Sequence, residues 1–159
     1  MGCPTDPPPD RGDAFNSGLT GTWSADFGNG YIDTYKITDS TVTEEGTGAM
    51  AHSTGSIEYV YNFSSIAGVI IVKFTTYTDD LSSVLPSYSL VGRYSAVYFN
   101  NLTATSVKLG TATDLSKNYM TESTDASVTT LEDAKERFKP TNINLWGGEL
   151  TGAGPLTKQ

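Results

Sequence analysis

Residues Ser56 to Thr78 read S-I-E-Y-V-Y-N-F-S-S-I-A-G-V-I-I-V-K-F-T-T-Y-T and hold the strongest strand pattern of the chain. In its first half, apolar and aromatic residues alternate with other residues, the pattern of a strand with one buried face: Ile57, Tyr59, Tyr61 and Phe63. The second half is apolar at successive positions from Val69 to Val72, which predicts a strand covered on both faces. With a tight turn at residues 64–68, the stretch predicts a β-hairpin at the centre of the hydrophobic core.

Shorter strand patterns flank this hairpin on both sides. They cover residues 19–26, 31–38 and 41–45 before it, and 90–100, 104–111 and 142–146 after it. Thr129 and Glu132 have the spacing of a capping box, and the apolar stripe that follows predicts one helix, which Pro140 ends. About eight strands and one short C-terminal helix indicate an all-β, antiparallel, up-and-down barrel.

The N-terminal residues differ in composition from the rest. Residues 1–18 hold four of the seven prolines, so we expect a disordered tether there, a single barrel domain over 19–147 and a flexible tail over 148–159. Cys3, the single cysteine, stands at the head of the tether like the lipidated first residue of a mature bacterial lipoprotein. Myristoylation at Gly2 fits less well, because Asp6 stands where that motif has Ser or Thr. The expected location is therefore extracytoplasmic, with lipidated Cys3 as the only anchor to the bacterial cell envelope.

Composition argues against several classes of function. The net charge of −8 disfavours nucleic-acid partners, because phosphate binding needs a surplus of lysine and arginine. The chain has one cysteine and one histidine. A Ser-His-Asp or Cys-His catalytic site therefore has no support beyond that one histidine, and a zinc site made of several histidines is excluded. We expect no metal, no cofactor and no catalytic residues.

The tyrosines carry the main binding hypothesis. Six of them stand in or beside predicted strands, and an inward-facing set would line a cavity for a small apolar or carbohydrate ligand: Tyr31, Tyr35, Tyr59, Tyr61, Tyr94 and Tyr98. The alternative is that they pair across strands for stability. Asp33 and Glu58 are the candidates for a glycosidase-type carboxylate pair, if they face each other across about 5–10 Å.

Two sequence resemblances support the predicted fold and the predicted cellular location. Leu19-Thr20-Gly21-Thr22-Trp23 resembles the Gly-x-Trp opening strand of lipocalin-like and avidin-like barrels, in which the Trp closes one end and leaves the other open for ligand. Two other lipocalin marks are not found, a Thr-Asp-Tyr loop motif and a basic residue on the last strand that would pack over Trp23. Segments 21–24, 68–74, 94–107 and 130–138 are similar to a family of uncharacterised spirochaete (treponemal) putative lipoproteins.

The leading hypothesis is a non-enzymatic, lipid-anchored, lipocalin-like barrel that binds a ligand through its open end. Loops 46–55, 79–89 and 113–128 would form the rim and supply Met50, His52, Tyr88, Tyr119 and Met120. The second hypothesis is a structural or protein-interaction module without a ligand cavity. The third is a hydrolase that uses Asp33 and Glu58.

Overall fold

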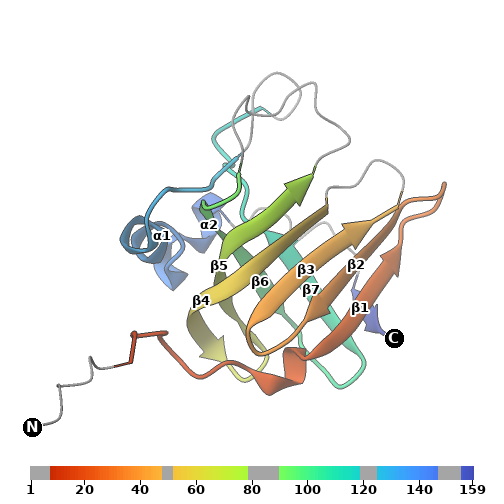
Figure 1. The fold of residues 1–159 in the computed structure, drawn as a ribbon. Helices are drawn as coiled ribbons and strands as arrows, with labels where there is room; N and C mark the ends of the chain where they lie inside the picture. Colours follow the sequence, from red (N-terminus) through yellow and green to blue (C-terminus); the bar gives the residue numbers. More distant parts are fainter. Residues whose placement is uncertain (1–7, 48–51, 79–89, 119–124, 147–154) are drawn as a thin grey trace, which may run out of the picture.

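The computed structural model describes residues 8–47, 52–78, 90–118, 125–146 and 155–159, and its strands form one closed antiparallel barrel (Figure 1). Each strand pairs with the next in chain order and the last pairs with the first, which confirms the predicted up-and-down, lipocalin-like barrel. The strands are β1 (Gly21–Asp26), β2 (Ile32–Ile37), β3 (Thr41–Gly46), β4 (His52–Ser64), β5 (Ala67–Thr78), β6 (Tyr94–Asn100), β7 (Ser106–Thr111) and β8 (Leu156–Lys158).

The predicted central hairpin is the pair β4–β5. Strand β5 is buried on both faces, as its unbroken apolar run predicts. Ile70 and Val72 point into the barrel with the main core, whereas Val69 and Ile71 belong to a second core on the outer face. This hairpin therefore connects two hydrophobic layers, one inside the barrel and one outside it.

A β-bulge at Glu58 overturns one expectation for β4. Ile57 pairs with Val72 and Tyr59 pairs with Ile71, so Glu58 is an extra residue without a cross-strand partner. An extra residue shifts the alternation by one position. Ile57 accordingly faces the barrel interior, while Tyr59 packs outside it, and the prediction that both share one face is wrong.

Two short helices cover the outer face of the sheet formed by β4, β5 and β6 (Figure 1). Helix α1 (Leu131–Arg137) is the predicted helix, but Thr130, not Thr129, caps it by accepting from the Asp133 amide at 3.1 Å. After the 3₁₀ turn η2 (Pro140–Asn142), α2 (Ile143–Trp146) occupies the segment predicted as a closing strand. That prediction is wrong because residues 143 and 146, one helical turn apart, both pack on the outer core.

The barrel is closed by β8, which lies in the segment predicted as a flexible tail. Leu156 is buried, and Lys158 pairs with Trp23 of β1. The Lys158 Nζ lies 5.1 Å from the centroid of the Trp23 ring. The basic residue over the tryptophan, which the sequence did not reveal, is therefore present, and the expectation of a frayed tail is wrong for residues 156–158.

One end of the barrel is filled by side chains. Trp23 is fully buried and its indole Nε1 donates to the Leu19 carbonyl at 2.8 Å. Leu19 ends the 3₁₀ turn η1 (Ser17–Leu19), and Leu102 from the β6–β7 turn belongs to the same core. These residues make the closed end that the Gly-x-Trp resemblance implies.

The expected tether is ordered in its second half. Beyond Ser56, β4 has no β3 partner, and residues 11–13 cover this edge: the Val60 amide donates to the Arg11 carbonyl and the Asp13 amide to the Val60 carbonyl. Gly12 has φ +76°, and a Cβ there would lie 2.4 Å from the Val60 carbonyl oxygen. The prediction of a disordered tether is therefore wrong from about residue 11 onward. Within the described ranges, no helix is long and apolar enough to cross a membrane.

Candidate functional site

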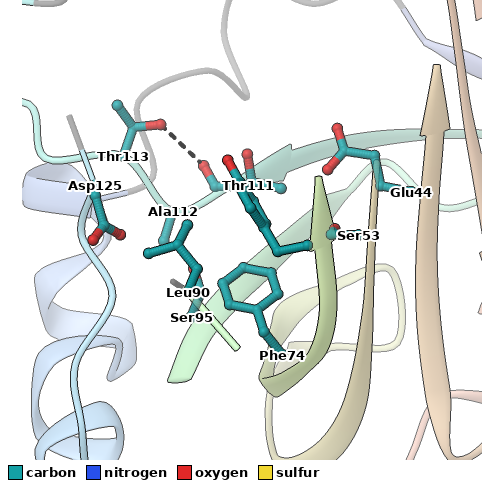
Figure 2. A pocket seen from close by; sticks show the side chains of 10 residues that line it. Glu44, Ser53, Phe74, Leu90, Ser95, Thr111, Ala112, Thr113 and Asp125 are labelled. Atoms are coloured by element: carbon teal, nitrogen blue, oxygen red, sulfur yellow. Dashed lines mark hydrogen bonds between the residues drawn. The ribbon is translucent and has the colours of Figure 1, made fainter. Parts of the chain in front are cut away.

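A cavity of about 200 Å³ opens at the end of the barrel opposite Trp23 (Figure 2). The strand ends around it are those of β3, β4, β5, β6 and β7. Its lining combines carboxylates, hydroxyls and apolar side chains: Glu44, Ser53, Phe74, Tyr77, Leu90, Ser95, Thr111, Ala112, Thr113 and Asp125. Figure 2 shows Glu44 and Asp125 on opposite sides, with Phe74 between them.

The cavity continues inward into a much smaller space of about 20 Å³. Glu44, Ser53, Phe74, Ser95 and Thr111 line both spaces. The floor of the inner space is apolar apart from one phenol, with Tyr35, Val42, Val72 and Val97 around it. A ligand entering from the mouth would therefore meet charge first and hydrocarbon last.

Glu44 and Tyr35 form the polar contact at the boundary between the two spaces. They are paired across β2 and β3, and the Tyr35 hydroxyl donates to Glu44 Oε1 at 3.0 Å. Burial, together with the Glu44 charge, raises the pKa of Tyr35 well above its usual value. Tyr35 therefore stays a neutral donor, and the negative charge of this pair resides on Glu44.

Asp33 adds a second carboxyl group on the same side of the barrel. It stands two residues before Tyr35 in β2, opposite Ala25, which packs against the inner core. Its Oδ1 is buried and has no hydrogen-bond partner among the described residues. Desolvation by this burial raises the pKa of Asp33 from 3.8 to about 6, opposed by a backbone hydrogen bond from Thr34.

The raised pKa of Asp33 makes a prediction about stability. When the pKa of a carboxyl group is higher in the folded than in the unfolded state, its contribution to the unfolding free energy is fully present below the unfolded pKa. For Asp33 this contribution is lost as pH rises through about 6. We expect Asp33→Asn, which is neutral at every pH, to raise the unfolding free energy by about 1–2 kcal/mol at about pH 8 and by almost nothing below about pH 4. The expected gain is smaller than the free energy that corresponds to the whole pKa shift, because water screens the charge of the partly exposed side chain.

Urea unfolding of wild type and variant at both pH values would measure this difference. Asp39→Asn, in the exposed β2–β3 turn, is the matched control and should change little at either pH. A gain of equal size at both pH values would show that the desolvated charge is not its cause.

The six predicted tyrosines do not line one cavity. Tyr35 alone lies inside the barrel, and Tyr31 is 43% exposed in the β1–β2 turn. The other four face the outer core beneath the helices: Tyr59, Tyr61, Tyr94 and Tyr98. The prediction of a tyrosine-lined interior is therefore wrong for five of them, because the Glu58 bulge and the alternation of β6 turn four outward.

The outward tyrosines hold the helices in place. The Tyr61 hydroxyl donates to the Lys135 carbonyl of α1 at 3.0 Å, and the Lys135 Nζ lies 4.7 Å from the Tyr59 ring centroid. Desolvation raises the pKa of Tyr61, so its phenol remains a donor. Tyr98 is fully buried between the sheet and the helices, and its hydroxyl has no partner among the described residues. The contacts of these four tyrosines therefore fit the alternative hypothesis, in which tyrosines stabilise the fold.

The carboxylate pair Asp33 and Glu58 is not brought together. Asp33 pairs with Gly46 near the open end, whereas Glu58 follows Ile57, whose amide donates to Ser40 in the β2–β3 turn at the other end. Glu58 instead accepts from Ser56 Oγ at 2.6 Å. Asp33 lies in β2 near the open end and Glu58 lies in β4 beside the β2–β3 turn at the other end, which contradicts the hydrolase hypothesis in this form.

The predicted rim residues are largely outside the described residues. Met50, Tyr88, Tyr119 and Met120 fall there, as does Cys3. His52 is not in a loop: it begins β4, opposite Thr78, and is partly buried. In the described parts of the chain, no group of three or more His, Cys, Asp or Glu side chains is placed to hold a metal ion.

Sequence reasoning missed Glu44, Ser53, Phe74 and Thr111 as lining residues of the cavity. One signal was present, because Glu44 stands two residues from Val42 in an alternating strand and so shares its inward face. No family model, curated protein or solved structure matches this chain. The likeness to spirochaete lipoproteins therefore stays a prediction.

Proposed function

We propose that this chain is a non-enzymatic binding module that takes a small molecule in the open-end cavity, and that Cys3 anchors it by lipidation to the outside of a bacterial membrane. The observation that carries the binding proposal is the contrast between the two ends of the barrel. Trp23, Leu19 and Leu102 fill one end, whereas the described residues at the other surround a cavity that continues into the interior. Concave sites with an apolar floor and a few polar groups are the usual form of small-molecule sites.

The size of the cavity restricts the ligand. At about 200 Å³, the cavity is below the range of about 300–1,000 Å³ that holds drug-sized ligands. A compact ligand with one apolar end fits it better than a long acyl chain. This refines the expected apolar or carbohydrate ligand toward a small amphipathic compound.

The binding proposal can be tested by native mass spectrometry of the protein purified gently from its own cells. We expect a small co-purifying mass, together with a diacylated or triacylated Cys3. Thr111→Trp would plug the mouth, because Thr111 lines both spaces, and should abolish the extra mass. Thr105→Trp makes the same change on an exposed turn at the closed end and should keep it.

Two results would contradict the proposal. An extra mass that survives Thr111→Trp would place the ligand outside the cavity. An unliganded mass with unmodified Cys3 would favour a module that recognises another macromolecule. For that second candidate there is one specific observation, the exposed apolar side chains at the β1–β2 turn, where Phe27 is 50% and Tyr31 43% exposed.

A further inference from the structure

The cavity is lined by negative and no positive side chains. Glu44 and Asp125 contribute carboxylates, and no lysine, arginine or histidine lines either the mouth or the inner space. All 10 lysines and arginines of the chain lie in the part that the structure describes, and none of them lines the cavity. The whole chain carries −8, which adds to the negative potential at the mouth.

One cation is linked to Asp125 through a hydroxyl group. Arg93 Nε donates to Ser127 Oγ at 2.7 Å, and that hydroxyl donates to Asp125 Oδ2 at 2.9 Å. Arg93 therefore offsets part of the charge of Asp125. Glu44 accepts from the neutral phenol of Tyr35, and Asp33 lies on the same side of the barrel. The negative charge is thus concentrated on the β2–β3 side.

Two aromatic side chains line the same cavity as the two carboxylates. Phe74 and Tyr77 both line the cavity, with ring centroids 5.5 Å apart and planes at 69°. A lining that combines aromatic rings with carboxylates can bind ammonium groups, through cation–π attraction and a charge-assisted hydrogen bond. Because the described residues form no group of three metal-binding side chains, an organic cation suits this lining better than a metal ion.

We infer that the cavity selects a small organic cation, a protonated amine attached to a compact apolar or aromatic group, with Glu44 as the residue that receives the ammonium. This inference rests on the proposed function and deepens it. The apolar group would lie in the cavity of about 200 Å³ against Phe74, Leu90 and Ala112. Carboxylate or phosphate ligands would be rejected, because they would be buried beside Glu44 without a partner.

Three probes of nearly equal shape test the inference at neutral pH: phenethylamine, phenethyl alcohol and phenylacetate. Binding is followed by NMR titration of backbone amides, with dissociation constants taken from the lining residues. We expect the amine to bind at least about tenfold more tightly than the alcohol, and phenylacetate to cause no saturable shifts. Raising the salt concentration should weaken binding of the amine and leave binding of the alcohol unchanged.

Glu44→Gln keeps an acceptor for the Tyr35 hydroxyl and removes the charge. The variant should raise the dissociation constant of the amine about tenfold and leave that of the alcohol unchanged. Glu45→Gln is the matched control, since Glu45 is the next residue on the opposite face and pairs with Lys36 at 2.8 Å; it should leave all three probes unchanged.

Failure of the inference and failure of the proposed function give different results. If the alcohol or phenylacetate shifts the lining amides and binds as tightly as the amine, the cation preference is overturned while the cavity remains a binding site. Amine binding that is unchanged in Glu44→Gln also overturns it. If none of the probes shifts the lining amides, both proposals fall.

Discussion

Replacing Trp23 with alanine should lower the free energy of unfolding by about 3–5 kcal/mol, a large fraction of the stability of a small domain. The indole is fully buried at the closed end, donates to the Leu19 carbonyl and lies beneath Lys158. Its removal would leave a cavity between the first strand, the η1 turn and the last strand. It would also leave the buried Leu19 carbonyl without its side-chain donor.

The chain supplies a matched control for this change. Its other tryptophan, Trp146, lies outside the barrel, is partly exposed and stacks with Arg137 at 4.5 Å. Trp146→Ala should cost about 1 kcal/mol, and Lys158→Met about 0.5–1 kcal/mol through the lost cation–π contact. Urea unfolding of the three variants would measure the differences. Equal losses for the two tryptophans would contradict the role given to Trp23 as the plug of the barrel.

Phe138→Ala is expected to have the second large effect, a loss of about 3–5 kcal/mol. Phe138 ends α1 and is fully buried against the outer core, which also contains Ile71 and Tyr98. A helix of seven residues is too short to persist alone, so its stability depends on this docking. The variant should therefore lose protection of the α1 amides against hydrogen exchange before those of β5.

Leu145→Ala in α2 is the matched control, since Leu145 is 57% exposed. Its effect should stay within about 0.5 kcal/mol. If Phe138→Ala unfolded the helices and the barrel together, with equal loss of protection in β5, the helices would be part of the barrel's cooperative unit and not a layer docked on it.

The sequence predicted most of the barrel because its strands follow local rules. Turn residues and alternating hydrophobicity placed β1, β2, β3, β6 and β7 close to their observed bounds. The unbroken apolar run of β5 required cover on both faces, and the structure provides it from the barrel interior and from the helices.

Local sequence patterns did not predict the pairing of strands that are far apart in the sequence. β8 has only three residues, and Leu156 is its one buried side chain. It is a strand because β1 and β7 each offer it a free edge. The same closure explains why residues 143–146 are helical: the edge they were expected to fill is already occupied.

The candidate site was missed for a related reason. One extra residue at Glu58 reverses the facing of residues 59–62 relative to Ile57, and a glutamate at that position does not predict a bulge. The tyrosines thus moved from the expected cavity to the outer core. Glu44 lies at the cavity because the β2–β3 register places it opposite Tyr35.

Closure of the barrel by β8 also fixes the order of events during synthesis. Strands β1 to β7 pair with neighbours in the sequence and can form hairpin by hairpin. Trp23, however, meets Lys158 only after all of the first seven strands have been made. Until then β1 and β7 are open edges, the kind of surface that pairs with other nascent chains. Pairing of Leu156–Lys158 with β1 and β7 therefore converts an aggregation-prone open sheet into a closed barrel.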